Sequence, residues 1–187
     1  MANSGQQLEP VTTEADKEYV KGLEIFLDAS SEDKFDVDGL FEQFPLFAEK
    51  TWTSLLQAGK CNLLDVGAGN GAKALYLAQR LATQGINTLV NSIEPKAEQR
   101  EALARRYQGD NTKFLGAIYP QPLSKISNTE KYDVLLFLHS LYEFPRHPDG
   151  TIASLDKIPS LLSNSGSAAI IVEDPKGDFQ RMKQDLY

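Results

Sequence analysis

The residues best suited to chemistry lie in one short motif. Asp65-x-Gly67-x-Gly69-x-Gly71 places a carboxylate two positions before three alternating glycines. Glycine has no Cβ atom, so the backbone can turn sharply there and a ligand can lie against it. The amide groups of a helix that begins near Ala72 then face that ligand. The motif predicts a turn that binds a nucleotide-type cofactor, and it leaves open which cofactor.

A second acid, Glu94, can hold the ribose of such a cofactor, because a carboxylate accepts hydrogen bonds from two neighbouring hydroxyls. Gly67-x-Gly69-x-x-Ala72 with Glu94 satisfies the dinucleotide pattern of nicotinamide-dependent proteins. The same segment, taken as an acid before three alternating glycines, resembles motif I of the class I S-adenosylmethionine-dependent methyltransferases. That resemblance implies S-adenosylmethionine as cofactor, with Asp65 and the glycines in the cofactor turn and Glu94 on the ribose. A purely structural turn and a solvated acid are the alternatives.

A third group of chemistry-bearing residues follows the apolar run 132–138. In methyltransferases of this class the corresponding loop lies between the sulfonium and the methyl acceptor. His139 can orient or deprotonate an acceptor, because imidazole titrates near neutral pH. Tyr142 can form an aromatic wall beside a cation, and Glu143 can pair with a cationic substrate. Structural roles remain open for these residues, and we predict no metal site.

The elements that must position these residues alternate between strand and helix. The predicted strands are 61–66, 88–94, 112–117, 132–138 and 167–173, and the predicted helices are 71–83, 96–107, 151–162 and 176–187. This alternation predicts an α/β fold with a doubly wound, mostly parallel sheet. Ligands of such sheets bind at the carboxyl ends of the strands, near the switch in strand order.

The chain before this core has a different character. We predict a disordered tail at 1–13, a helical substrate cap at 14–58 and the cofactor-binding core at 59–187. Within the cap, apolar residues predict a helix at 14–28, an interruption at 29–33 and a second helix at 40–56, broken near Pro45. Residues 1–57 carry 12 acids and 4 bases, a net charge of −8, whereas the remainder carries 14 acids and 15 bases, or +1. An acidic cap argues against a nucleic-acid substrate and is compatible with a cationic small molecule.

Composition sets the wider frame. A chain of 187 residues is long enough for one domain with a substantial core. The single cysteine, Cys61, excludes an intrachain disulfide and favours a reducing compartment. The polar N-terminus lacks the apolar core of a signal peptide, and no run of apolar residues is long enough to span a membrane. We therefore expect a soluble cytoplasmic protein without a membrane partner.

Several further stretches resemble the histamine N-methyltransferase family. They occur in the same order with similar spacing, and the most specific is Glu-Pro-x-Ala-Glu-Gln at 94–99; the others are 17–32, 141–142, 160–162 and 169–172. The resemblance implies that Glu32 contacts an amine substrate. It also implies that Gly67, Glu94, Gln99 and the backbone near Leu138 contact the cofactor.

Two departures from that family bear on function. The position of His139 is a glutamine in the histamine enzyme, so the acceptor can differ. The family also continues beyond the point where this sequence stops, with two further strands. A strand at 167–173 without those neighbours would invite pairing with another chain.

The function predicted from the sequence is methyl transfer to a nitrogen of a small amine or imidazole compound. His139 is the catalytic candidate, and Glu32, His139, Tyr142 and Glu143 are the predicted substrate contacts. A non-catalytic, methyltransferase-like binding protein is the main alternative. A nicotinamide-dependent oxidoreductase is a weaker alternative, because the sequence has no Tyr-x-x-x-Lys pair. Transfer to oxygen or carbon also stays open.

Overall fold

The structure is a computed structural model that describes residues 32–127, 129–141 and 155–172. Glu32 and Asp33 are described by their backbone only. The predicted tail at 1–13 and the predicted helices at 14–28 and 176–187 lie outside the described residues. Tyr142 and Glu143 also lie outside them.

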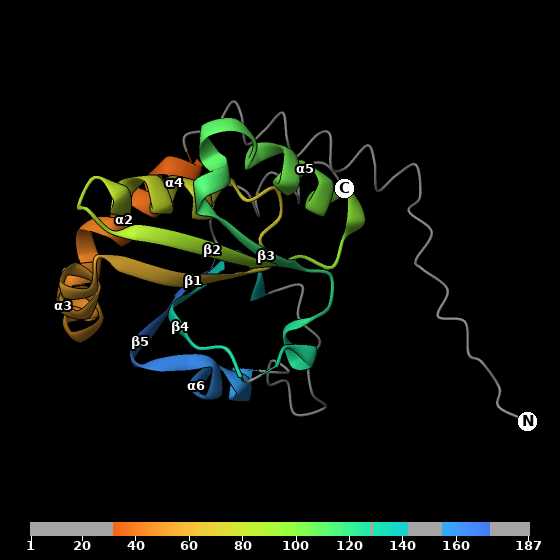
Figure 1. Cartoon of the computed structure of the whole chain (residues 1–187). Helices are drawn as coiled ribbons and strands as arrows, with labels where there is room; N and C mark the ends of the chain where they lie inside the picture. Colours follow the sequence, from red (N-terminus) through yellow and green to blue (C-terminus); the bar gives the residue numbers. More distant parts are fainter. Residues whose placement is uncertain (1–31, 128, 142–154, 173–187) are drawn as a thin grey trace, which may run out of the picture. The chain divides into compact units, whose positions relative to one another are not determined.

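A five-stranded, wholly parallel sheet forms the centre of the described chain (Figure 1). The strand order is β3-β2-β1-β4-β5, with bounds Leu115–Tyr119, Asn87–Ile93, Lys60–Val66, Tyr132–Leu138 and Leu162–Ile171. From β1 the chain adds strands toward one edge of the sheet as far as β3, and it then crosses over to add β4 on the other side of β1. Strands β1 and β4 are therefore neighbours in space but not in sequence. The doubly wound parallel sheet predicted from the sequence is therefore confirmed. The turn after β1 and the loop after β4 emerge side by side at this switch point.

The sheet is buried on both faces because its central strands are apolar at consecutive positions. Successive side chains of a strand point to opposite faces. In β1, Leu63 belongs to one hydrophobic cluster and Leu64 to the other, and both are fully buried. In β4, Leu136 and Phe137 divide between the same two clusters. Such two-sided burial is typical of strands covered by helices on both faces.

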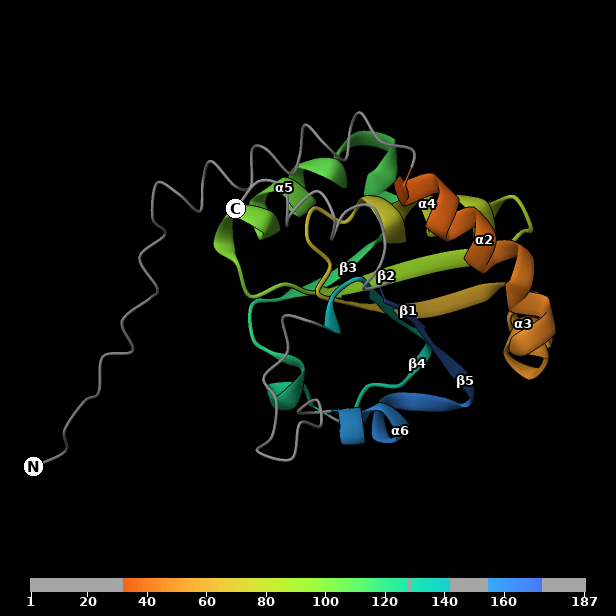
Figure 2. The ribbon, with the colours of Figure 1, turned by 180° about the vertical axis from the view of Figure 1, so that it is seen from behind.

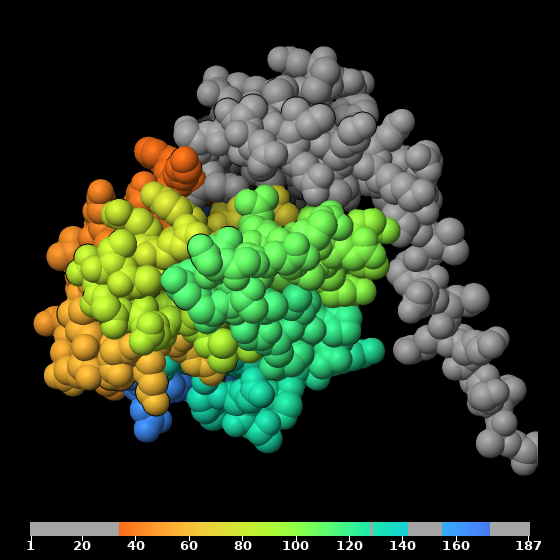
Figure 3. Space-filling model, turned by 45° about the horizontal axis from the view of Figure 1, so that its top comes forward, coloured from red at the N-terminus to blue at the C-terminus, as the bar shows by residue number. Residues whose placement is uncertain are grey.

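Helices provide the two covering layers. Their bounds are Glu32–Phe47 for α2, Glu49–Ala58 for α3, Ala72–Ala82 for α4, Ala97–Arg106 for α5 and Ile158–Leu161 for α6. Helices α2, α4 and α5 lie on one face of the sheet and α6 on the other (Figures 1 and 2). The segments from α2 to α5, orange to green, adjoin one another in the space-filling view (Figure 3). In the part of the chain that the structure describes, no helix is long and apolar enough to cross a membrane.

The N-terminal helices differ from the prediction in where they break. The interruption expected at 29–33 is wrong for Glu32 and Asp33, which belong to α2, and the break expected near Pro45 occurs at Ala48. Pro45 lacks an amide hydrogen, so the helix loses one internal hydrogen bond there. Aromatic packing supports this part of α2, because the Trp52 ring on α3 contacts both Phe41 and Phe44 edge to face.

Two strands begin elsewhere than the sequence predicts. β3 starts at Leu115 rather than 112, because 109–114 form a 3-10 helix in which the Thr112 hydroxyl donates to the Gly109 carbonyl. β5 starts at Leu162 rather than 167, and the helix predicted at 151–162 is limited, among described residues, to 155–161. The polar start of β5 gave no apolar signal. Its side chains instead form hydrogen bonds, such as that from Ser163 Oγ to Asp133.

Candidate active site

The glycine turn lies between β1 and α4, and all three glycines have positive φ: 75° at Gly67, 54° at Gly69 and 75° at Gly71. Positive φ is strained for residues with a side chain, which accounts for the glycines at these positions. The turn is held to β2, because the Gly67 and Ala68 amides both donate to the Ile93 carbonyl, at 2.9 and 3.1 Å. The acid and glycine motif therefore folds into a fixed loop at the switch point.

The three glycines face different surroundings. A Cβ atom on Gly67 would lie 2.5 Å from the Cβ of Ser140, and one on Gly71 would lie 3.0 Å from atoms of Leu103 and Tyr107. At Gly69 the nearest atom would be Gln99 Oε1 at 3.9 Å. Packing within the protein thus explains Gly67 and Gly71. Gly69 has an open face bordered by Gln99, and a ligand could approach the backbone there. The cofactor roles of all three remain predictions.

Glu94 follows the last residue of β2 and is buried, with 5% of its surface exposed. Its carboxylate accepts hydrogen bonds from the Gly69 amide at 2.8 Å and the Lys96 amide at 2.9 Å. The Arg100 guanidinium donates to the Glu94 carbonyl at 3.0 Å and fixes the backbone of this loop. The predicted ribose acid is therefore anchored directly to the predicted cofactor turn. A carboxylate oxygen can accept more than one hydrogen bond.

Asp65 lies on β1 beneath the glycine turn and is 3% exposed. The pKa of its carboxyl is raised to about 7, chiefly by burial and further by the nearby charge of Glu94, whereas Lys73 opposes the shift. Burial also raises the pKa of the neighbouring Tyr107 phenol, as does the charge of Asp65. A carboxylate held here at a raised pKa is costly for folding, a feature that clusters at functional sites.

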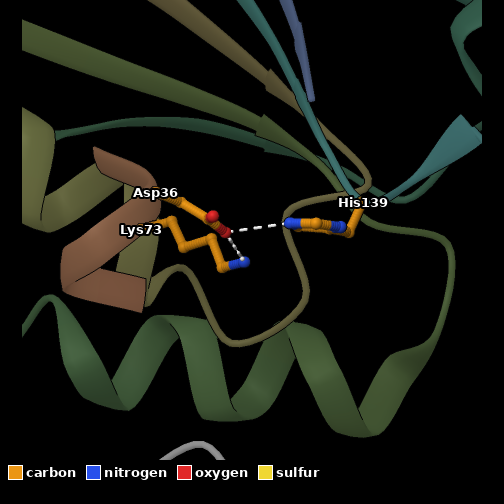
Figure 4. A network of polar contacts seen from close by, with 3 residues as sticks. All are labelled: Asp36, Lys73 and His139. Atoms are coloured by element: carbon orange, nitrogen blue, oxygen red, sulfur yellow. Dashed lines mark hydrogen bonds and ion pairs between the residues drawn. The ribbon is translucent and has the colours of Figure 1, made fainter. Parts of the chain in front are cut away.

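His139 follows β4 in an unusual backbone conformation, with φ of 56°. Its amide donates to the Ile171 carbonyl of β5 at 2.9 Å, and its ring Nε2 lies 2.9 Å from Asp36 Oδ2. The same Asp36 oxygen accepts a hydrogen bond from Lys73 Nζ at 2.8 Å (Figure 4). Burial alone would raise the pKa of Asp36, but the hydrogen bonds from His139 and Lys73 lower it below its ordinary value.

Sequence reasoning missed both Asp36 and Lys73. Asp36 on α2 is 103 residues from His139 along the chain. No local pattern marked Asp36 among the many acids of residues 1–57. The signal for Lys73 was only its place in the first turn of α4, directly after the glycine motif.

The structure brings most of the predicted site residues to the carboxyl edge of the sheet. Gln99, on α5, is 6% exposed and lies beside Gly69, and Leu138 is the last residue of β4. Glu32 is the first residue of α2 and is described by its backbone only, so its substrate role stays a prediction. The roles of Tyr142 and Glu143, which lie outside the described residues, also stay predictions. Among the residues that the structure describes, no group of His, Cys, Asp and Glu side chains could hold a metal ion.

This fold and strand order define a Rossmann-like α/β protein of the kind found in methyltransferases. Neither a protein-family model nor a curated protein sequence matches the chain. Among solved structures, coclaurine N-methyltransferase, bound to N-methylheliamine and SAH, superposes with a TM-score of 0.52 and 19% identity. The match covers 73% of this chain and 34% of that one, so this chain spans about a third of the length of that enzyme.

Two other solved structures are described as S-adenosylmethionine-dependent methyltransferases and have lower TM-scores. The one from Methanococcus maripaludis gives 0.47 at 13% identity and covers 80% of this chain and 68% of that one. The one from Listeria monocytogenes gives 0.46 at 23% identity and covers 70% and 55%.

Proposed function

We propose that this chain binds S-adenosylmethionine and transfers its methyl group to a nitrogen of a small amine or imidazole compound. The observation that carries the proposal is the bond between Glu94 and the Gly69 amide. It joins an acid at the end of β2 to the acid and glycine turn after β1, at the switch point of the sheet. The shared fold with an N-methyltransferase supports the proposal.

The residues at the sheet edge fit this cofactor. Glu94 would accept hydrogen bonds from the ribose hydroxyls, and the open face of Gly69 would allow close approach to the backbone. Gln99, beside Gly69, would supply amide hydrogen bonds from α5. When bound, S-adenosylmethionine supplies a methyl group on a positively charged sulfur, already activated for transfer. The protein then has mainly to align the acceptor and exclude water.

A cationic or nitrogen-containing acceptor is supported by charge. The segment 1–57 has a net charge of −8, and Asp36 on α2 brings a carboxylate of that segment to His139. A neutral nitrogen lone pair needs no strong base to attack the methyl carbon. His139 can take the proton that the nitrogen loses. Glu32 is proposed to pair with the substrate ammonium.

Calorimetric titration with S-adenosylhomocysteine, with NAD as the parallel control, tests the cofactor. We expect micromolar binding of S-adenosylhomocysteine alone. Glu94→Ala should weaken it by about 2 kcal/mol, or about 30-fold, the scale of a charge-assisted hydrogen bond. Glu101→Ala on α5 is the matched control, because the Glu101 side chain is 75% exposed. Binding of NAD instead, or an unchanged affinity of the Glu94 variant, would contradict the assignment.

Labelled S-adenosylmethionine then tests the acceptor. The panel contains histamine, other small amines and imidazoles, with phenols and carboxylic acids as oxygen acceptors. We expect label on nitrogen, and Glu32→Gln should raise the KM of the amine without weakening cofactor binding, because it removes the charge that pairs with ammonium. Label on oxygen or carbon would refute the nitrogen assignment. Cofactor binding without turnover on any acceptor would favour the non-catalytic alternative.

A further inference from the structure

We infer that Asp36 is the positioning residue of His139: its carboxylate fixes the ring as the Nε2–H tautomer, so that Nδ1 carries the lone pair that accepts a proton. The inference deepens the proposed methyl transfer and rests on it. It assigns a role in the reaction to a residue of α2 that the sequence did not single out.

The tautomer follows from the contact between Asp36 and the ring. Asp36 Oδ2 lies 2.9 Å from His139 Nε2, which is hydrogen-bonding distance. An ionised carboxylate can only accept hydrogen bonds, so Nε2 must be the donor. In a neutral imidazole the other nitrogen, Nδ1, then holds the lone pair.

Lys73 provides the reason why Asp36 stays ionised. Its ammonium lies 2.8 Å from the same Asp36 oxygen, and the side chains of Asp36 and Lys73 are only 14% and 16% exposed. Charges so shielded from solvent interact more strongly than charges at the surface. Asp36 on α2 contacts the ring, and Lys73 on α4 contacts the same carboxylate oxygen. A carboxylate between Lys73 and His139 therefore acts on the ring as a fixed acceptor.

The backbone of His139 is held in a conformation that a histidine rarely adopts. Its φ of 56° lies in the left-handed region, which is uncommon for residues other than glycine. Such strain persists only where the surroundings impose it. The hydrogen bond from the His139 amide to the Ile171 carbonyl holds the main chain, and the hydrogen bond to Asp36 holds the ring. Figure 4 shows the ring edge directed at the carboxylate.

In the reaction this arrangement would remove one proton from the acceptor nitrogen. The acceptor nitrogen uses its lone pair to form the bond to the methyl carbon, and the carbon–sulfur bond breaks with its electron pair remaining on sulfur. The positive charge thus moves to nitrogen, which releases a proton to Nδ1 of His139. The resulting imidazolium donates from Nε2 to Asp36, whose negative charge stabilises it.

The tautomer can be read without any activity. The sequence has two histidines, so His147→Gln leaves His139 as the only imidazole. Ring nitrogen-15 shifts of the labelled protein at pH 8, correlated with the ring carbon-bound protons, distinguish the two neutral tautomers. We expect Nε2 to show the protonated shift and Nδ1 the unprotonated shift. A wild-type ring with its proton on Nδ1 would overturn the inference before any variant of Asp36 is made.

Asp36→Asn and Asp38→Asn form a matched pair. Both acids lie on α2 and bond to α4, but Asp38 bonds the Tyr76 hydroxyl at 3.0 Å and faces Arg80 at 3.3 Å. We expect Asp36→Asn to abolish the preference for Nε2–H and to lower kcat at least tenfold, with affinity for S-adenosylhomocysteine within twofold. Asp38→Asn should change neither the tautomer nor kcat.

The outcomes separate this inference from the proposed function. An Asp36→Asn protein that keeps the wild-type tautomer, or keeps the wild-type kcat, overturns the positioning role while wild-type turnover still supports methyl transfer. A wild-type protein that binds no S-adenosylhomocysteine overturns the proposed function, whatever the tautomer. Circular dichroism of both variants confirms that they fold. Should Asp36→Asn fail to fold, the wild-type tautomer alone still decides between the two assignments of the ring proton.

Discussion

Two sets of polar side chains, each at least partly buried, lie on or against the same sheet and differ in how they are hydrogen-bonded. The first, here called the polar ladder, consists of Asn62, Asn91, Asp133 and Ser163. The Ala117 amide of β3 donates to Asn91 Oδ1 at 3.0 Å, and Asn91 Nδ2 donates to Asn62 Oδ1 at 2.7 Å. The backbone amide of Asn62 and Ser163 Oγ both donate to the Asp133 carboxylate at 2.9 Å. The ladder therefore joins all five strands through satisfied hydrogen bonds.

The second set, here called the edge cluster, consists of Asp36, Asp65, Glu94, His139 and Ser140. Burial raises the pKa of Asp65 to about 7, and His139 has a φ of 56°. Ser140 is 5% exposed, and its hydroxyl has no hydrogen-bond partner among the described residues.

The difference shows where the molecule keeps features that lower its stability. Hydrogen bonds of the ladder replace bonds to water and set the register of the strands. The edge cluster instead combines a buried acid, a strained backbone and a hydroxyl without a partner among the described residues, at the place where ligands bind in this fold. Such concentrated cost is expected at functional sites. The comparison predicts that ladder variants lose stability and that edge variants lose binding.

Asp65→Asn should show the largest effect and sharpen the comparison. The folded-state pKa of about 7 exceeds the ordinary 3.8. Between these values the unfolded chain releases its proton while the folded chain keeps it, so stability falls as pH rises. The loss amounts to at most about 4 kcal/mol above pH 7, and Asn avoids it. Urea unfolding from pH 4.5 to 8 should therefore show that the free energy of unfolding of the variant rises relative to that of wild type as the pH increases.

The exposed Asp110→Asn supplies the control for that series. Its stability should follow the wild-type pH dependence. If the curves of Asp65→Asn and wild type run parallel across this range, the cost assigned to the buried acid does not exist.

Asn91→Leu tests the ladder. The change leaves the Ala117 amide and Asn62 Oδ1 without their partner, at a cost of about 3 kcal/mol in the free energy of unfolding. Because Asn91 lies within β2 and not at its carboxyl end, affinity for S-adenosylhomocysteine should stay within twofold. Urea unfolding and calorimetry measure the two quantities. A variant of wild-type stability with weakened binding would reverse the assigned roles.

Much of the fold could be predicted because the core strands are marked by their own composition. Strand β4 occupies the predicted residues 132–138, and β1 and β2 differ from prediction by one residue at their ends. These strands have apolar residues at consecutive positions, such as Leu63-Leu64 in β1 and 134–138 in β4, because both faces of the sheet are covered. The start of β5 could not be predicted in this way, since it is polar: Ser163 donates a hydrogen bond to Asp133 of β4 and Ser165 donates one to Ser54 of α3.

The candidate site could be predicted only in part for a related reason. Asp65, the glycines and Glu94 lie next to the strand ends that position them, so local sequence reveals them. The position of Asp36 beside His139 depends on where α2 packs across α4. No local pattern in α2 predicts that contact. The close approach of Ser140 to Gly67 could not be predicted either, because it depends on the loop after β4 lying against the glycine turn, where a Cβ atom on Gly67 would be 2.5 Å from that of Ser140.

Gly67→Ala and Gly69→Ala compare the two sides of the glycine turn. The first places a Cβ atom against Ser140 in a positive-φ position, and we expect about 2 kcal/mol of lost stability. The second meets only Gln99 Oε1 at 3.9 Å, so about 1 kcal/mol of backbone strain is expected. In calorimetry Gly69→Ala should nevertheless weaken S-adenosylhomocysteine more than tenfold. Unimpaired binding by Gly69→Ala would show that the ligand does not approach this backbone.

Ser140→Ala and Thr88→Val form the finest test, because both remove a buried hydroxyl that lacks a partner among the described residues. Removing an unpaired hydroxyl should leave stability within about 1 kcal/mol of wild type or slightly raise it. Thr88 lies near the start of β2, far along the strand from Glu94, so its variant should bind S-adenosylhomocysteine normally. Ser140 adjoins the glycine turn, and its variant should bind about fivefold more weakly, the scale of one neutral hydrogen bond. Equal affinities for the two variants would mean that the Ser140 hydroxyl is a packing group like that of Thr88, and the edge cluster would then consist of its charged members alone.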